Sequence, residues 1–339
     1  MSSLRPASGT ASEVLALLRA WDAADDPEPL IIETSGSTGR PKRVALSRDA
    51  MRASASATLE RLGGPGQWVL NLPPTYVAGV QVLFRSVMAG TEPVVQTSEL
   101  SDAVLEMAGG RRYVSLVPTQ LVRLLDNGYQ TGALGRFDAV LIGGGPLSPT
   151  VRAEAERAKV RIVQTYGMSE TCGGCVYDGI PLDGVEMRIK DDQVQLRGPI
   201  LFDGYDGEPE RTAAAFDDTW LITNDLGRLT HDGRLQVLGR ADDVIISGGV
   251  KVPAYAVQQM LEQHPRIFSA AVVGVPDAEW GERVVAVLDA DDPPPLDELR
   301  DLVTPREWAP RAMLKVDEIP LLSNGKVDRA TLKELAAHG

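Results

Sequence analysis

The sequence is poor in cysteine, histidine and aromatic residues. Among 339 residues, Cys172 and Cys175 are the only cysteines, three residues are histidines, and 5% are aromatic. Two cysteines cannot frame a disulfide-rich secreted domain, and the histidines show no zinc-ligand spacing. We therefore expect a protein that folds around a hydrophobic core in a reducing compartment.

Long apolar runs and an excess of basic residues are also missing. No stretch approaches the roughly 18 apolar residues of a membrane span. The N-terminal stretch carries Arg5, Glu13 and Arg19, which indicates an amphipathic helix rather than a signal peptide. Lys plus Arg number 34 against 47 Asp plus Glu, a net charge of −13, whereas a nucleic-acid binder needs a basic face. We expect a cytoplasmic protein with no nucleic-acid partner and no membrane span.

Short apolar runs alternate with helical stretches between residues 30 and 165. The runs predict strands at 30–32, 68–72, 93–95, 113–117, 139–142 and 161–163. The stretches between them predict helices at 47–62, 77–89, 100–107, 118–125 and 148–158, with Ser47 and Ser148 as N-caps. Strands separated by helices favour a mostly parallel sheet, in which ligands bind beyond the carboxyl ends of the strands.

The pattern changes after residue 165. Short runs punctuated by glycine and aspartate, without helices between them, predict a small antiparallel region. Beyond residues 239–243, helices at 254–263 and 329–337 and strands at 270–275 and 284–288 can form their own core. The expected fold class is α/β: a large N-terminal domain (1–241) with a mostly parallel sheet flanked by helices plus a small antiparallel region, followed by a small α+β C-terminal domain (242–339).

The segment TSGSTGRPK follows the first predicted strand. Glycines let backbone N–H groups converge on an anion, hydroxyls add donors, and a lysine adds a compact charge. The residues of this type are Thr34, Ser35, Gly36, Ser37, Thr38, Gly39 and Lys42. No Walker pattern fits the segment. It predicts a phosphate-binding loop, and the alternative is a polar strand-to-helix loop that binds nothing.

TSGSTGRPK resembles the phosphate loop of the adenylate-forming enzymes, the superfamily of acyl-CoA synthetases, luciferases and peptide-synthetase adenylation domains. Further motifs follow in the order of that family. They are GGGPLS (143–148), YGMSET (166–171), QLRGPILFDGY (195–205), ITNDLGRL (222–229), GRADDVIISGG (239–249) and LLSNGKVDR (321–329). The resemblance covers almost the whole chain.

The resemblance implies residue roles. For ATP it implies the loop residues named above together with Gly143, Gly144, Gly145, Tyr166, Gly167, Asp225 and Arg240, the last two on the ribose. For catalysis it implies Thr171 at the α-phosphate, Glu170 as a ligand of Mg²⁺, and Lys326 as the adenylation lysine carried by a mobile C-terminal domain. Asp242 would be the hinge, and Gly248 and Gly249 would meet coenzyme A.

VPTQLVRLL (117–125), Cys172 and the SGG run at 247–249 look like the o-succinylbenzoate–CoA ligases of menaquinone biosynthesis. This resemblance implies an ATP-dependent ligase that adenylates an aromatic acid and passes the acyl group to coenzyme A, with Mg²⁺ and no redox cofactor. The acid-binding residues are predicted as Tyr76, Gly79, Gln81, Thr119, Gln120 and Thr165. Arg85, on the same predicted helix as Gln81, is a candidate anchor for a second carboxylate.

Departures from the family leave alternatives open. Only 33 residues precede Thr34, so we expect part of the usual N-terminal subdomain to be missing, and Tyr76 stands where many acyl-CoA synthetases have histidine. The chain could instead be a CoA ligase for another acid or a non-catalytic nucleotide-binding regulator. Cys172 and Cys175 could form a redox dithiol rather than two small core residues. The oligomeric state, a homodimer included, stays open.

Overall fold

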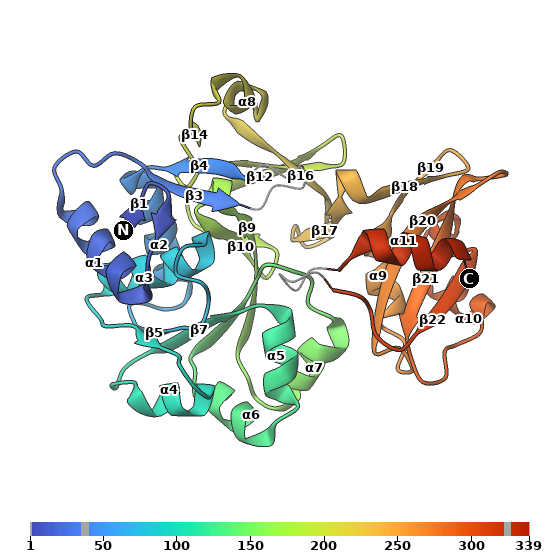
Figure 1. Cartoon of the computed structure of the whole chain (residues 1–339), viewed down its shortest axis with the longest axis horizontal. Coiled ribbons are helices and arrows are strands. Elements are labelled where there is room, and N and C mark those ends of the chain that lie inside the picture. Colours follow the sequence, from blue (N-terminus) through green and yellow to red (C-terminus); the bar gives the residue numbers. More distant parts are fainter. Residues whose placement is uncertain (1, 35–40, 322–326, 339) are drawn as a thin grey trace.

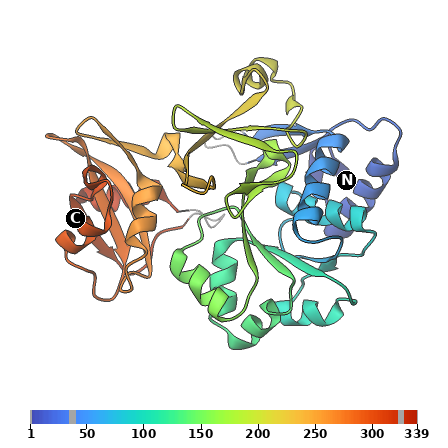
Figure 2. The ribbon, with the colours of Figure 1, turned by 180° about the vertical axis from the view of Figure 1, so that it is seen from behind.

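The chain folds into a large N-terminal lobe and a smaller C-terminal lobe (Figures 1 and 2). A computed structural model describes residues 2–34, 41–321 and 327–338. The helices of the large lobe are α1 (Ala11–Ala23), α2 (Arg48–Arg61), α3 (Val77–Ala89), α4 (Leu100–Glu106), α5 (Pro118–Leu125), α6 (Gly128–Leu134), α7 (Pro149–Arg157) and α8 (Pro209–Ala214). Within the part of the chain that the structure describes, none of the helices has the length and apolar character of a membrane-spanning segment.

A seven-stranded sheet forms the centre of the large lobe. Its strands are β5 (Gln67–Leu70), β6 (Val94–Val95), β7 (Arg112–Leu116), β8 (Ala139–Ile142), β9 (Ile162–Met168), β10 (Gly173–Tyr177) and β11 (Ile180–Pro181), in the order β11-β10-β9-β8-β7-β5-β6. The pairs from β6 to β9 are parallel, whereas β10 and β11 are antiparallel additions at one edge. The predicted mostly parallel sheet is confirmed.

Two hydrophobic clusters cover the two faces of this sheet. Trp68 in β5 and Leu141 in β8 point into the cluster formed with α1, α2 and α3. Their neighbours Val69 and Val140 point into the cluster formed with α4, α5, α6 and α7. Successive side chains of a strand face opposite ways, and strands covered on both faces are therefore apolar throughout. This double cover holds the carboxyl ends of the strands, and the loops that follow them, in place.

The first predicted strand lies outside this sheet, which corrects our expectation. The strand β3 (Leu30–Thr34) pairs antiparallel with β4 (Lys42–Leu46), and β4 pairs with the short β14 (Gly204–Tyr205) in a separate sheet. Parallel neighbours need a crossover of a dozen or more residues, and only a short loop separates β3 from β4. The glycine-rich segment therefore joins two strands of a hairpin rather than a strand and a helix.

The antiparallel region expected after residue 165 is confirmed, but the expected absence of helices between its strands is wrong, because α8 lies between β14 and β15. Its strands are β12 (Glu186–Lys190), β13 (Gln193–Arg197), β15 (Phe216–Asp217), β16 (Trp220–Leu229) and β17 (Leu235–Arg240). Residues 220–229 form one long strand, β16, whose register shifts between Leu226 and Gly227. This bulge separates the part of β16 that pairs with β13 from the part that pairs with β17.

The C-terminal lobe is a five-stranded sheet with helices on both faces. The strands are β18 (Val244–Ser247), β19 (Val250–Pro253), β20 (Ser269–Asp277), β21 (Gly281–Asp289) and β22 (Ala312–Val316), and the helices are α9 (Ala254–Leu261), α10 (Leu296–Leu302) and α11 (Arg329–His338). Val272 faces the cluster with α9 and α10, whereas Val273 faces the cluster with α11. The lobe has its own core, as expected, although β19, β22 and α10 were not predicted from the sequence. The boundary between residues 241 and 242 stays a prediction.

Capping residues explain where several helices begin. The Thr10 side chain and Glu13 form a reciprocal capping box at α1, and the predicted cap Ser47 accepts a hydrogen bond from the Ala50 N–H at α2. Ser148 precedes α7 without a side-chain cap, so Pro149 at the first helical position marks that start instead. A hairpin of β1 (Ser3–Leu4) and β2 (Ala7–Ser8) precedes α1.

Candidate active site

The ends of the glycine-rich segment are fixed by the β3–β4 hairpin. Thr34 and Lys42 face each other in its register. The predicted phosphate-binding residues between them, Ser35, Gly36, Ser37, Thr38 and Gly39, lie outside the described residues. Lys42 points its ammonium group toward Glu170, with 3.9 Å between Nζ and Oε1. The hairpin therefore carries one predicted ATP-binding cation to the predicted Mg²⁺ ligand.

Glu170 lies at the centre of a cluster that combines a cation, a carboxylate and a phenol. It belongs to the 3-10 turn η1 (Ser169–Thr171) and is 9% exposed. The Tyr205 hydroxyl donates to Glu170 Oε1 at 2.9 Å, and Lys42 Nζ lies 5.8 Å from the centre of the Tyr205 ring. Burial and the Glu170 carboxylate raise the pKa of Tyr205, so it stays a hydrogen-bond donor. Tyr205 was not predicted as a site residue, although it ends the motif QLRGPILFDGY.

A second polar cluster joins β9 to the β16–β17 hairpin. The Tyr166 hydroxyl donates to Asp225 Oδ2 at 2.8 Å, and Arg240 lies opposite Asp225 with 3.9 Å between Nη1 and Oδ1. Burial raises the pKa of Asp225, an effect that the Tyr166 hydrogen bond and the Arg240 charge oppose. Arg240 also donates to both carboxylate oxygens of Asp242, at 2.9 and 3.2 Å. The structure thus brings together three residues predicted for ATP and the predicted hinge.

Glycine is required at two of the predicted nucleotide positions, because a backbone carbonyl lies against one of them and a side-chain hydroxyl against the other. A Cβ at Gly167 would be 2.0 Å from the carbonyl oxygen of Gly173 in the paired strand β10. A Cβ at Gly143 would be 2.6 Å from the Thr165 hydroxyl oxygen, which brings these two predicted residues into contact. Gly144 and Gly145 follow directly, the former with a φ of 77°.

Thr171 uses its hydroxyl within its own turn. The hydroxyl donates to carbonyl oxygens, with 2.7 Å to that of Gly173, and accepts from the Met168 N–H at 2.9 Å. Thr171 is fully buried. In this arrangement the side chain shapes the turn that presents Glu170, and its predicted contact with the α-phosphate stays a prediction.

The predicted acid-binding residues of α3 are deeply placed. Gly79 packs so closely on the Pro73 carbonyl that a Cβ would lie 2.0 Å from that oxygen. Gln81 is 1% exposed, and its amide oxygen Oε1 is buried without a hydrogen-bond partner in the described part of the chain. Gln81 packs against Gly173, just after η1. One turn further along α3, Arg85 is 4% exposed and lies 5.1 Å from the Trp68 ring.

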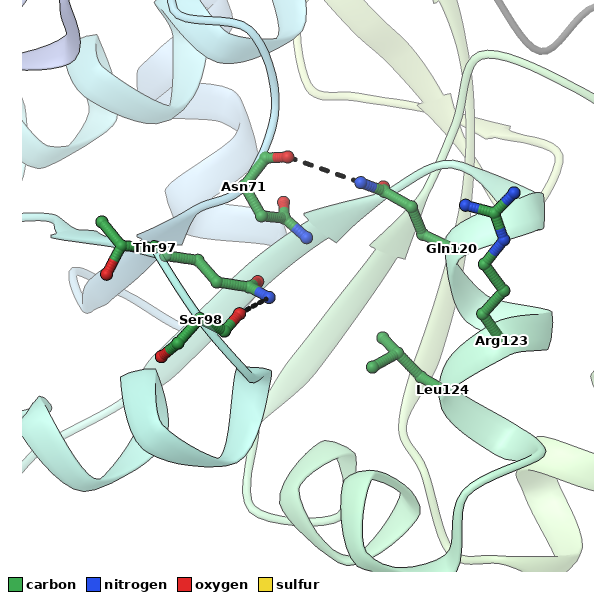
Figure 3. Close-up of a pocket in the computed structure, with 7 residues that line it drawn as sticks. Asn71, Thr97, Ser98, Gln120, Arg123 and Leu124 are labelled. Carbon is green, nitrogen blue, oxygen red and sulfur yellow. Dashed lines mark hydrogen bonds between the residues drawn. The ribbon is translucent and has the colours of Figure 1, made fainter.

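The remaining predicted acid-binding residues lie nearer the surface. Gln120 lines a recess of about 310 Å³ at the carboxyl edge of the sheet, between Asn71 and Arg123 (Figure 3). Its amide accepts from the Val117 N–H at 2.9 Å and donates to the Asn71 carbonyl at 3.4 Å, so it ties α5 to the end of β5. Thr119 is exposed, and Tyr76, at the start of α3, is 58% exposed.

The residues predicted for coenzyme A lie in a hairpin turn of the C-terminal lobe. Gly248 and Gly249 connect β18 to β19 with φ values of 58° and 80°. A Cβ at Gly248 would meet the Trp280 ring at 2.7 Å, so glycine lets the turn close on that ring. The predicted adenylation lysine, Lys326, lies outside the described residues.

Cys172 and Cys175 behave as core residues. Both are fully buried in the cluster that covers one face of the central sheet. Burial raises the pKa of both thiols, that of Cys175 to about 12, so neither forms a reactive thiolate near neutral pH. These observations favour the core interpretation over a redox dithiol.

Comparison with known families agrees with this geometry. The AMP-binding enzyme family matches residues 11–208, and the AMP-binding enzyme C-terminal domain matches residues 256–326. The chain belongs to the AMP-binding enzyme family. The first match contains the polar cluster around Glu170, and the second ends at Lys326.

Curated relatives of this AMP-binding enzyme include ligases of one kind. A probable 2-succinylbenzoate–CoA ligase from Mycobacterium tuberculosis is 43% identical over 335 residues, which cover 94% of this chain and 87% of that protein. The 2-succinylbenzoate–CoA ligase of Bacillus pumilus is 32% identical and covers 89% of this chain and 68% of its own length.

Solved structures of related enzymes share the fold. The o-succinylbenzoate CoA synthetase of Bacillus subtilis, solved with its acyl-adenylate intermediate, is 28% identical with a TM-score of 0.74, covering 89% of this chain and 68% of that one. An amide bond synthetase from Marinactinospora thermotolerans is 30% identical with a TM-score of 0.79, and the match covers 92% of this chain and 72% of that one. The two-lobed α/β architecture is thus shared with a CoA synthetase and with an amide bond synthetase.

In this AMP-binding enzyme we predict that Asp225 binds the ribose hydroxyls of ATP. Asp225→Asn removes the charged acceptor, and a hydrogen bond to a charged group contributes about 1.5–3 kcal/mol. We expect the KM for ATP to rise by roughly 10- to 100-fold in steady-state assays. Asp232→Asn, which changes an exposed aspartate in the turn between β16 and β17, is the matched control and should leave the KM unaltered. An unchanged KM in the Asp225 variant would contradict the assignment.

Proposed function

We propose that this chain is a 2-succinylbenzoate–CoA ligase of menaquinone biosynthesis. A carboxylate oxygen of the acid attacks the α-phosphorus of ATP and pyrophosphate leaves. The sulfur of coenzyme A then attacks the acyl-adenylate, the thioester forms, and AMP leaves. The relatives support this proposal because they carry that name and align along nearly the whole chain.

The main observation that supports a dicarboxylate substrate is that Arg85 is buried without a carboxylate partner among the described residues. Burial lowers the pKa of Arg85, and no carboxylate in the described part of the chain opposes that effect. Its Nε is buried without a hydrogen-bond partner among the described residues. An unpaired buried guanidinium is costly, and a ligand carboxylate with two parallel hydrogen bonds would compensate it. We propose that Arg85 holds the carboxylate of 2-succinylbenzoate that is not adenylated.

The first half-reaction joins two anions, so it depends on positioning and on neutralising charge. Lys42, at the end of the glycine-rich segment, is suited to the β- and γ-phosphates, which leave as pyrophosphate. Asp225 and Arg240 would fix the ribose, and Tyr166 would lie along the adenine. Lys326 would contact both the acid carboxylate and the α-phosphate. Tyr76, Gly79, Thr119, Gln120 and Thr165 would surround the acid above Gln81.

The donor set fits one Mg²⁺ ion brought in with ATP. Among the described residues no group of three or more His, Cys, Asp or Glu side chains could hold a metal by itself. Mg²⁺ usually binds one or two carboxylates together with substrate phosphates and waters, and Glu170 beside Lys42 meets that need. When bound, the ion would offset the charge on the phosphate oxygens. The Tyr205 hydroxyl donates to Glu170 and would orient its carboxylate for this role.

The two lobes would divide the two half-reactions. We propose that residues 1–241 bind ATP and the acid, and that residues 242–339 rotate about Asp242. One orientation presents Lys326 for adenylation, and the other presents Gly248 and Gly249 to coenzyme A. Because ATP and coenzyme A are its co-substrates, we place the enzyme in the cytoplasm.

A panel of carboxylic acids tests this proposal. We expect pyrophosphate release with 2-succinylbenzoate, followed by a thioester when coenzyme A is added, and far weaker release with benzoate or with fatty acids. Activity centred on a monocarboxylic acid would identify a ligase for another acid. Formation of an amide with an added amine, in place of a thioester with coenzyme A, would point to an amide-forming enzyme. Nucleotide binding without release from any acid would indicate a regulator.

A further inference from the structure

Two successive aspartates tie the connection between the lobes to opposite sides. They lie in the 3-10 turn η2 (Ala241–Asp243), between β17 and β18. Asp242 accepts two hydrogen bonds from Arg240, at the edge of the Tyr166–Asp225 cluster of the large lobe. Asp243 Oδ1 lies 3.3 Å from Nε of Arg329, at the start of α11 in the C-terminal lobe. Each aspartate therefore pairs with an arginine of a different lobe.

Arg329 connects this turn to β20 of the C-terminal sheet. Its Nη1 donates to the carbonyl oxygen of Val272 in β20 at 3.2 Å, while its Nε faces Asp243. One guanidinium group thus contacts both the lobe connection and a strand of the C-terminal sheet. Arg329 also follows Lys326 by three positions in the sequence.

The residues on either side of 322–326 are paired with each other. Leu321 and Val327 form an antiparallel bridge, and the Asp328 N–H donates to the Pro320 carbonyl at 2.9 Å. Asp328 then caps α11, because its carboxylate accepts from the N–H and the hydroxyl of Thr331 at 3.1 and 2.9 Å. An anchor at Arg329 therefore fixes the point from which the chain reaches Lys326.

We propose that Asp243 and Arg329 are positioning residues for adenylation, and this rests on the proposed role of Lys326. Their ion pair fixes the start of α11 to the turn at which the lobes join, so a change in the orientation of the turn carries the start of α11 with it. Asp242 is bound to the large-lobe cluster and Asp243 to the lysine-bearing side. The orientation of η2 thereby sets where α11, which begins three positions after Lys326, lies relative to the nucleotide cluster.

The Asp243–Arg329 ion pair should affect the rate of adenylation more than the stability of the folded protein. Both side chains are partly exposed, at 28% for Asp243 and 31% for Arg329, and ion pairs of this kind contribute little to folding. A misplacement of about 1 Å at a reacting group can nevertheless lower a rate by up to a hundredfold. A positioning role and a merely structural role therefore give different results.

The test is Asp243→Asn, assayed in both half-reactions of the full chain with 2-succinylbenzoate. We expect pyrophosphate release to fall roughly tenfold, while a supplied acyl-adenylate reacts with coenzyme A within about twofold of the wild-type rate. The reversed pair, Asp243→Arg with Arg329→Asp, should recover part of the lost rate. Asp292→Asn, which removes a 3.2 Å ion pair with Arg266 in the same lobe, is the control and should change neither step.

Three outcomes would overturn the proposal. Unchanged pyrophosphate release in Asp243→Asn would do so, and so would an equal loss in both half-reactions together with a lowered Tm, which indicates a structural role. Failure of the wild-type chain to adenylate any acid would overturn the proposed function and this inference with it. Loss confined to adenylation at an unchanged Tm, with recovery in the reversed pair, supports the inference.

Discussion

Replacing Lys326 with alanine is expected to lower adenylation by roughly a hundredfold or more, because one preorganised donor at the developing charge contributes about 3–4 kcal/mol. The acid carboxylate and the α-phosphate are both anionic, and Lys326 is the cation predicted to contact both. Thioester formation from a supplied acyl-adenylate should continue, since the proposed rotation withdraws the lysine before that step. Pyrophosphate release and thioester formation, measured separately, check this result.

Lys315→Ala is the matched control for this variant. Lys315 lies in the same lobe, where its ammonium group donates to the Asp291 carbonyl at 2.7 Å, away from the lobe connection. We expect neither half-reaction to change in the control. Equal loss of both half-reactions in Lys326→Ala would contradict the division of labour between the two lobe orientations.

The order of strands and helices in the large lobe could be predicted because the sheet is covered on both faces. Trp68 and Val69 enter different cores, so their strand is apolar throughout and easily recognised. The hairpin of β3 and β4 was missed because β4 reads KRVAL, with two cations at its start, directly after the glycine-rich segment. Strand β22 was missed because its exposed and half-buried residues alternate without a strong apolar run.

Site residues could be predicted where they belong to a sequence motif. They could not be predicted where they reach the site only through contacts between distant segments of the fold. Asp225 and Arg240 belong to separate motifs, and their pairing in one hairpin follows only from the β16–β17 register. Tyr205 reaches Glu170 because β14 pairs with β4, a contact between distant segments. The sequence also cannot show whether a hydroxyl or an amide is already used by backbone, as those of Thr171 and Gln120 are.

Replacing Arg85 with leucine is expected to lower kcat/KM for 2-succinylbenzoate by about 30-fold or more. Removing one partner of a buried charge pair costs about 2–5 kcal/mol, and every 1.4 kcal/mol is tenfold. The loss should be specific to the dicarboxylate, because benzoate has no second carboxylate to pair with the guanidinium. The ratio of kcat/KM for the two acids is the measurement, and Arg85→Lys should retain part of the preference.

The stability of this variant separates a ligand anchor from a structural arginine. In the described structure Arg85 is 4% exposed beside Trp68 with no carboxylate partner, so leucine should fill its site without loss of a salt bridge. We expect the Tm of the ligand-free Arg85→Leu variant to equal or exceed that of the wild type, while 2-succinylbenzoate stabilises only the wild type. A lowered Tm with an unchanged acid preference would show that Arg85 supports the fold and that another group selects the acid. If Arg85 serves to bind the substrate, the variant should be stable and should lose its preference for 2-succinylbenzoate over benzoate. The reason is that the favourable interaction of Arg85 forms only when the acid is bound.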